Sequence, residues 1–181
     1  RISFTDDKLS GMDAVIATGS NNSARYFEYY FRNIPHIIRK NRNSIAILKG
    51  DESEEELKEL AKDVFSYFGL GCRNVTKVFV PRNYDLDNLF KAFFRWKDIS
   101  NNNKYANNYD YNKAVYLMNK IELIENGFLM LKEDEGLHSP LSVLFYQYYN
   151  NQNEVQEYIS SNNDKLQCIV SQKETPFGKA Q

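Results

Sequence analysis

The sequence predicts an α/β fold with a largely parallel sheet and flanking helices. Short apolar runs of strand length alternate along the chain with longer segments whose apolar residues recur at helical spacing. Glycine turns separate several of these segments. Strands that alternate with helices are typical of a parallel sheet, so this pattern predicts the fold class directly.

The composition is that of an ordinary globular protein with 42% hydrophobic and 26% charged residues. A length of 181 residues suffices for one medium domain, or one domain and a piece of another, with a real core. The net charge of −1 argues against nucleic acid or a membrane surface as a partner. No apolar run is long enough to span a membrane, and no stretch resembles a signal peptide.

The few cysteines and histidines limit the chemistry. Two cysteines do not form a disulfide framework, so we expect a reducing, cytoplasmic location. The two cysteines and two histidines are not closely spaced, and we expect no metal site. The chain starts at Arg1 and ends on TPFGKAQ without a closing helix or strand, so we expect a piece of a longer protein.

The first predicted unit is a strand over 13–17, a TGS turn at 18–20 and a helix over 24–31. A strand, a glycine turn and a helix start can aim backbone N–H groups at an anion. The same arrangement is also an ordinary connection between a strand and a helix. The basic cluster at 39–42 is either a solvated turn or a phosphate-binding patch.

The central stretch begins with a strand over 44–48. A helix follows, capped by Ser53 or Asp51 and rich in glutamate in its first turn. A GLG turn at 69–71 then delivers Cys72 to the head of the next strand. The helix is expected to bury one apolar face, consisting of Leu57, Leu60, Ala61, Val64, Phe65 and Phe68.

The rest of the chain continues the alternation. The predicted elements are a strand over 75–80, a helix from 85 or 87 to 96, a helix over 113–124, strands over 128–132 and 143–148, a helix over 153–159 and a strand over 166–170. The stretch SNNNKYANNYDYN at 100–112 lacks hydrophobic periodicity, so an exposed loop is expected there.

Cys72 is either a packed core residue or a nucleophile, because free cysteines are usually buried and inert. Its flanking glycines would let the backbone approach a substrate closely. Arg73 is adjacent and Lys77 lies further along, so positive charge could favour a thiolate. Cys168 has none of these neighbours, and its place in the apolar run LQCIV predicts a core position.

These residues suggest a family. The segment 42–81 resembles the catalytic-cysteine segment of the aldehyde dehydrogenase superfamily. The stretch ATGS at 17–20 is similar to the Thr-Gly-Ser loop beside the cofactor there, and SPLSVL at 139–144 to its Gly-Pro-Val segment. Within the superfamily, RKNRNS at 39–44 and GLGCRN at 69–74 resemble most the bacterial acyl-CoA reductases of the bioluminescence fatty-acid-reductase type. Weaker matches follow in the same order at 153–155 and 162–166.

The resemblance implies an aldehyde dehydrogenase-like catalytic domain and a covalent mechanism. Cys72 would attack an acyl-CoA, coenzyme A would leave, and NADPH or NADH would reduce the acyl-cysteine to an aldehyde. The backbone N–H of Cys72 would be one oxyanion donor. Hydrolytic members carry a glutamate that activates water at a position equivalent to one near Ile38 here, and the following turn here is Lys40-Asn41. Without that base, thioester exchange is favoured over hydrolysis.

The same resemblance implies further assignments. Gly19 and Ser20 would lie beside the cofactor, and Glu135 would take the place of the ribose contact. Residues 1–35 would be the edge of the nucleotide-binding domain. Residues 36–181 would be the catalytic (cysteine) domain, and the fragment would be truncated at both ends of the full protein. The full-length protein is expected to be a homo-oligomer, and the isolated chain is expected to be inactive.

Several alternatives remain open from the residues alone. An acyl-phosphate reductase or an aldehyde dehydrogenase of the same superfamily would also use Cys72. A non-catalytic α/β interaction module would instead bury this cysteine. Its tyrosine-rich stretches at 26–31 and 146–149 would then be interfacial or edges of the core. His36 is either a proton carrier or a polar turn residue, and His138 is expected to be structural.

Overall fold

The computed structural model describes residues 4, 6, 11–19, 21–39 and 43–181. The chain forms two compact units, Arg1–Asn41 and Arg42–Gln181. The first unit contains β1 (Val15–Thr18), α1 (Asn21–Tyr30) and β2 (His36–Arg39), and the two strands pair in parallel. The boundary between these two compact units follows β2, because β2 pairs with β1.

The second unit is built on a six-stranded sheet with the strand order β5-β6-β7-β4-β3-β8. Every pair in it is parallel except β5 with β6, which confirms the predicted α/β class. Its strands are β3 (Asn43–Ile47), β4 (Val75–Pro81), β5 (Ile124–Glu125), β6 (Met130–Glu133), β7 (Val143–Tyr149) and β8 (Leu166–Val170). Its helices are α2 (Glu54–Phe65), η1 (Ser66–Gly69), α3 (Asp87–Phe93), η2 (Phe94–Asn101), α4 (Asn103–Met118), α5 (Gln152–Asn162) and η3 (Asn163–Lys165).

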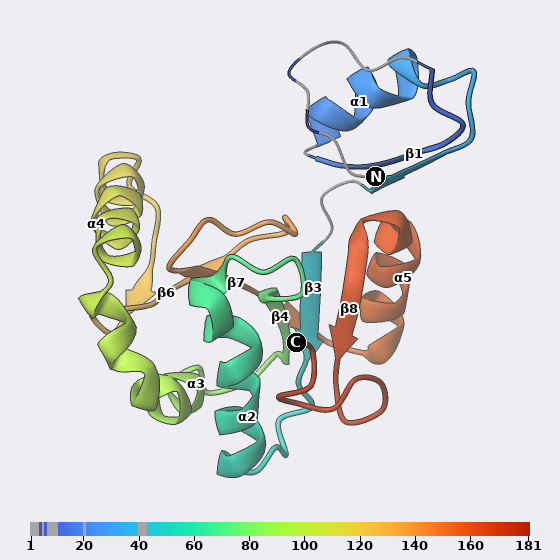
Figure 1. Cartoon of the computed structure of the whole chain (residues 1–181). Helices are drawn as coiled ribbons and strands as arrows, with labels where there is room; N and C mark the ends of the chain where they lie inside the picture. Colours follow the sequence, from blue (N-terminus) through green and yellow to red (C-terminus); the bar gives the residue numbers. More distant parts are fainter. Residues whose placement is uncertain (1–3, 5, 7–10, 20, 40–42) are drawn as a thin grey trace. The chain divides into compact units, whose positions relative to one another are not determined.

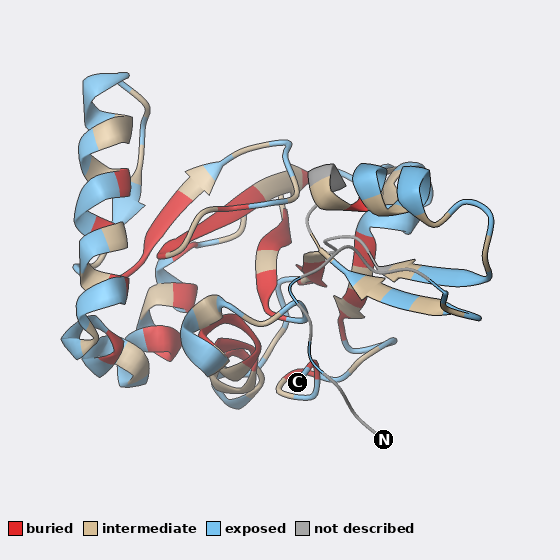
Figure 2. Cartoon of the chain, turned by 45° about the horizontal axis from the view of Figure 1, so that its top comes forward, coloured by how far each residue is buried: buried red, intermediate tan, exposed pale blue. Residues whose placement is uncertain are grey.

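Helices cover both faces of this sheet. On one face, α2 and α3 lie side by side and bury apolar side chains against β3, β4 and β7 (Figure 1). On the other face, Val155 of α5 packs against Ile45 of β3 and Phe79 of β4. The buried residues are concentrated in the central strands and on the inner sides of the helices (Figure 2). No helix in the described part of the chain is both long and apolar enough to cross a membrane.

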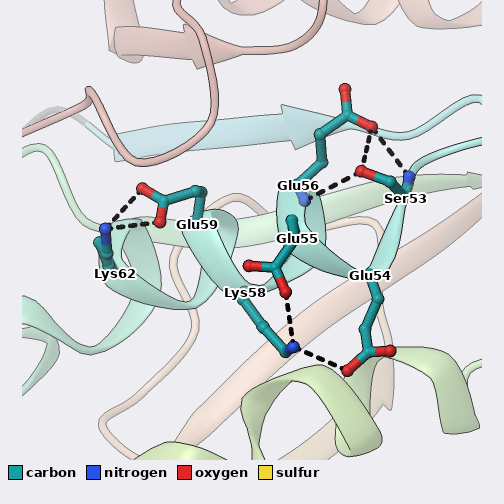
Figure 3. Close-up of polar contacts among 7 residues, drawn as sticks. All are labelled: Ser53, Glu54, Glu55, Glu56, Lys58, Glu59 and Lys62. Carbon is teal, nitrogen blue, oxygen red and sulfur yellow. Dashed lines mark hydrogen bonds and ion pairs between the residues drawn. The ribbon is translucent and has the colours of Figure 1, made fainter.

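The start of α2 is fixed by a capping box (Figure 3). The backbone N–H of Glu56 donates to Ser53 Oγ over 3.2 Å, and the backbone N–H of Ser53 donates to Glu56 Oε2 over 2.8 Å. Two otherwise unpaired donors are thereby satisfied. Ser53 is therefore the cap, rather than Asp51. Lys58 pairs with Glu54 and Glu55 on the exposed side of the same helix.

The end of α2 differs from the prediction. The buried face ends at Phe65, and Phe68 is 44% exposed instead of buried. The chain leaves the helix at Ser66, whose ψ is 142°. Tyr67 and Phe68 then adopt left-handed φ angles of 53° and 59°. This reversal turns the Phe68 side chain away from the face that helical spacing would give it.

Relieving this left-handed backbone should stabilise the protein. Side chains other than glycine pay about 1–2 kcal/mol in this region, and Tyr67 is 71% exposed, so glycine would remove little packing there. We expect Tyr67→Gly to raise the free energy of unfolding by about 1 kcal/mol. The matched variant Tyr111→Gly changes an exposed tyrosine within α4 and should lower it by about 1 kcal/mol. Urea unfolding measures the free energy of unfolding of both variants. If both variants are less stable than the wild-type protein, the backbone at Tyr67 is not strained.

The exposed loop predicted over 100–112 is wrong, because most of this stretch belongs to helix α4. Asn102 caps it by accepting a hydrogen bond from the backbone N–H of Tyr105 over 3.1 Å. Tyr105, Tyr109 and Asn112 are buried on one side of the helix. Because these inward residues are polar or aromatic, an aliphatic periodicity was absent. The helix predicted over 113–124 ends at Met118.

Candidate active site

Cys72 lies on a tight turn directly before β4. The backbone N–H of Asn74 donates to the carbonyl of Gly71 over 3.0 Å and closes the 71–74 turn. The backbone N–H of Gly71 in turn donates to Asn74 Oδ1 over 2.7 Å. Cys72 and Arg73 occupy the two central positions of this turn and are exposed. The core alternative for Cys72 is therefore wrong.

Asn74 fixes this turn to the end of α2. Its side chain is buried, and Nδ2 donates to the carbonyls of Asp63 over 2.9 Å and Val64 over 3.1 Å. These carbonyls belong to the last turn of the helix, where backbone acceptors need partners from outside the helix. A Cβ added to Gly71 would lie 2.7 Å from Asn74 Oδ1, so the turn requires glycine at this position. Sequence reasoning missed Asn74, although asparagine is a characteristic turn residue.

The surroundings of the thiol are partly apolar. Tyr67, Phe68 and Leu70 are exposed and precede Cys72 within a few residues. Because β4 and β7 are parallel, the loop that leads into β7 ends at the same edge of the sheet as the 71–74 turn. Leu141 of that loop reaches Gly69, where an added Cβ would lie 3.4 Å from its Cδ1. The cysteine turn thus lies at the amino ends of β4 and β7, and exposed apolar residues precede it in the chain.

Cys168 is in a different environment. It is buried in β8, and its Sγ donates to Thr175 Oγ1 over 3.2 Å. This confirms the predicted core position. The two thiols differ in exposure, so only Cys72 is accessible to a reagent or substrate while the protein is folded.

Lys77 is a fully buried cation on β4, on the sheet face covered by α5. Its Nζ donates to the carbonyl of Asp134 over 2.9 Å and to Gln147 Oε1 over 2.7 Å. It also lies 4.5 Å from the centre of the Tyr158 ring. Burial lowers the pKa of Lys77 to about 8, and the carboxylates of Asp134 and Glu135 act in the opposite direction. Lys77 holds the loop after β6 rather than facing Cys72.

The lowered pKa of Lys77 predicts a pH dependence of stability. Above about pH 8, the unfolded chain keeps a proton on Lys77 that the folded chain loses. The free energy of unfolding should therefore rise with pH, by up to about 1.4 kcal/mol per pH unit from this group. Lys77→Met should flatten this slope. Urea unfolding at about pH 7.5 and about pH 9.5 tests it, and parallel slopes for the two proteins would refute the expectation.

Glu135 lies in the loop that follows β6. It is exposed, and its backbone carbonyl accepts a hydrogen bond from Tyr158 Oη over 2.8 Å. The loop then returns across the sheet, and His138 Nδ1 lies 2.8 Å from Asn43 Oδ1 at the start of β3. His138 thus holds two elements together, in line with the structural role expected of it. No hydrogen bond among the described residues joins Glu135 to Cys72, and the cofactor role of Glu135 stays a prediction.

The other predicted cofactor residues belong to the first unit. Gly19 follows β1, and a Cβ added there would lie 2.8 Å from Ser23 Cβ and 3.1 Å from Phe27 Cε2 of α1. Close packing of the turn on α1 therefore requires glycine. Ser20 lies outside the described residues. His36 Nδ1 lies 2.9 Å from the carbonyl of Ile34, an acceptor, so the ring donates and stabilises its own turn.

Comparison with known proteins identifies the fold. No family model and no curated protein matches this chain. Among solved structures, it is similar to P. syringae AldA, an indole-3-acetaldehyde dehydrogenase in complex with NAD+ and IAA, at 12% identity and a TM-score of 0.61 over 88% of this chain and 40% of that chain. The fold is aldehyde dehydrogenase-like.

Two further structures agree with this fold. An aldehyde dehydrogenase from Bacillus cereus shares 14% identity at a TM-score of 0.62, over 88% of this chain and 44% of that chain. The Mycobacterium tuberculosis aldehyde dehydrogenase complexed with NAD+ shares 14% identity at a TM-score of 0.59, over 88% and 45%. The chain therefore spans less than half the length of these aldehyde dehydrogenases. The fold predicted from the resemblance is confirmed.

Proposed function

We propose that the full-length protein reduces an acyl-CoA thioester to an aldehyde through a covalent acyl-cysteine at Cys72. The observation that carries this proposal is an exposed cysteine on a rigid turn of an aldehyde dehydrogenase-like fold. The coarser assignment, an oxidoreductase of aldehydes that uses a nicotinamide cofactor, is supported by the dehydrogenases of similar fold, two of which are complexes with NAD+.

Cys72 performs the covalent chemistry in this proposal. Its thiolate attacks the carbonyl carbon of the thioester, a bond forms to Sγ, and the bond to the sulfur of coenzyme A breaks. Coenzyme A leaves as a thiolate and takes up a proton from water. The backbone N–H of Cys72 belongs to the same residue as the attacking sulfur and is a candidate donor to the developing oxyanion. After reduction, the thiohemiacetal on Cys72 collapses and releases the aldehyde and the thiolate.

NADPH or NADH, when bound, supplies the hydride for this reduction. The β1–α1 connection is the part of this chain that we assign to its phosphates. The ten-residue helix α1 begins two residues after Gly19, at Asn21, and has no acidic residue in its first turn. Such a helix start favours negative charge. The residues present therefore fit a dinucleotide.

The acyl acceptor is inferred from the missing base. Water needs a carboxylate to take its proton before it can attack an acyl-cysteine. The position that the resemblance gives to that carboxylate lies near Ile38, and β2 carries no aspartate or glutamate there. Exchange between two thiols needs no such base, because a thiolate is itself the nucleophile and the leaving group. This favours acyl-CoA over hydrolytic aldehyde oxidation.

The test uses the full-length protein with NADPH or NADH and a series of acyl-CoA thioesters. We expect loss of nicotinamide absorbance matched one for one by free coenzyme A thiol and by aldehyde. Oxidation of aldehydes by NAD+ without coenzyme A would instead support a hydrolytic dehydrogenase. An acyl phosphate accepted in place of the thioester would support the acyl-phosphate reductase alternative.

A further inference from the structure

Asp63 is a buried carboxylate that the proposed chemistry does not use. It lies on α2, on the side that also carries Leu60 and Val64, and its exposed fraction is 0%. No ion pair joins it to a lysine or arginine of the described ranges. A charged group without solvent or a counterion is costly unless hydrogen bonds replace the lost water. The hydrogen-bond partners of Asp63 therefore indicate what its buried carboxylate does.

Both carboxylate oxygens of Asp63 accept hydrogen bonds from one distant segment. The backbone N–H of Gly178 donates to Oδ2 over 2.7 Å, and that of Ala180 donates to Oδ1 over 3.0 Å. The 175–181 segment is also held by burial of Phe177 and Ala180 in the core beside α2. Asp63 thus fixes the path of a segment without regular secondary structure.

The backbone of the same residue holds the cysteine turn. The carbonyl of Asp63 accepts from Asn74 Nδ2 over 2.9 Å, and Asn74 Oδ1 accepts from the N–H of Gly71 over 2.7 Å. The 175–181 segment also reaches this turn directly. A Cβ added to Gly71 would lie 3.3 Å from Gln181 Oε1, so the Gln181 side chain lies against the turn.

We propose that Asp63 is a positioning residue that couples the 175–181 segment to the turn carrying Cys72. Its carboxylate fixes the segment and its carbonyl fixes Asn74. A shift of the segment therefore reaches Gly71 by two routes, through Asn74 and through the Gln181 side chain. The segment thereby belongs to the support of the thiol, although it lies far from Cys72 in the sequence. Only the activity measurement below rests on the proposed function.

The isosteric variant Asp63→Asn tests the coupling in the full chain. The amide keeps one acceptor but turns an NH₂ group toward the second backbone N–H, so one of the two hydrogen bonds is lost. We expect hydrogen exchange of the Gly71 amide to accelerate about tenfold, together with those of Gly178 and Ala180. The control is Glu59→Gln. Glu59 also lies on α2 and beside Gly178, but its carboxylate pairs with Lys62. Its removal should change the exchange rate of the Gly71 amide less than about twofold.

The outcomes separate coupling from simple anchoring. If Gly178 and Ala180 exchange faster in Asp63→Asn while Gly71 does not, Asp63 only anchors the segment, and the proposal is overturned. If Asp63→Asn fails to fold, Gln181→Ala replaces it, because this exposed side chain is not needed for the core. Faster exchange at Gly71 in Gln181→Ala then supports the coupling, and unchanged exchange rejects it.

An activity measurement gives a second readout. In the full-length enzyme, Asp63→Asn should lower kcat for acyl-CoA reduction about tenfold and leave KM within about twofold, because the thiol is displaced but the substrate site is intact. Cys168 should stay protected from alkylation, which excludes unfolding as the cause. If the wild-type protein reduces no acyl-CoA, the proposed function fails, while the exchange at Gly71 still decides the coupling.

Discussion

Full-length protein with alanine in place of Cys72 should form no acyl-enzyme and should lose acyl-CoA reduction. The expected fall in kcat is on the order of 10⁶, because the covalent route has no second nucleophile to replace the thiolate. Incubation with a radioactive acyl-CoA, followed by denaturing electrophoresis, measures the acyl-enzyme. The folded state should be unaffected, since Cys72 is exposed on its turn and makes no hydrogen bond through Sγ to a described residue.

Cys168→Ala is the matched control for this experiment. Because Cys168 is buried in β8, its removal should leave the radioactive label in place and cost only about 1 kcal/mol of stability. A label that survives Cys72→Ala would refute the assignment of the nucleophile. Alkylation of the native protein gives an independent check: Cys72 should react with iodoacetamide, and Cys168 only after unfolding.

Much of the sheet was predictable because its strands are apolar and bounded by turn residues. The strand over 166–170 was predicted with its observed bounds, and those over 44–48 and 75–80 within one residue. The buried face of α2 was correct up to Phe65, because helical spacing holds as long as the helix continues. The exposure of Cys72 was left open, since a glycine-flanked cysteine before a strand fits both environments.

The errors share a physical cause, which is that periodicity describes only regular aliphatic elements. Phe68 continues the helical spacing, but a left-handed turn has already ended the helix. Helix α4 was missed because Tyr105 and Asn112 take the inward positions that leucine usually fills. Asp63 lies within the apolar face of α2, and this break in the pattern was the one visible sign of its partners. Those partners come from a segment that no local pattern could connect with it.

Phe65 is the last residue of α2 and is buried in the core. Of the variants proposed for this protein, its truncation should lower the free energy of unfolding most. Its ring centre lies 5.5 Å from that of Phe93, 5.7 Å from Trp96 and 5.8 Å from Phe128. Phe65 therefore joins α2 to α3, η2 and the β5–β6 connection in one aromatic cluster.

Phe65→Ala should lower the free energy of unfolding by about 3–5 kcal/mol, because it removes a buried ring and leaves a cavity that three rigid aromatic neighbours cannot fill. Phe68→Ala, three residues later, should change it by less than about 1 kcal/mol, since that side chain is 44% exposed. Urea unfolding of both variants gives the comparison. Similar losses would mean that the helix continues past Phe65 and buries Phe68, as its spacing alone suggests. A large difference requires the left-handed turn at 67–68, which is also what places Gly69 and Cys72 at the edge of the sheet.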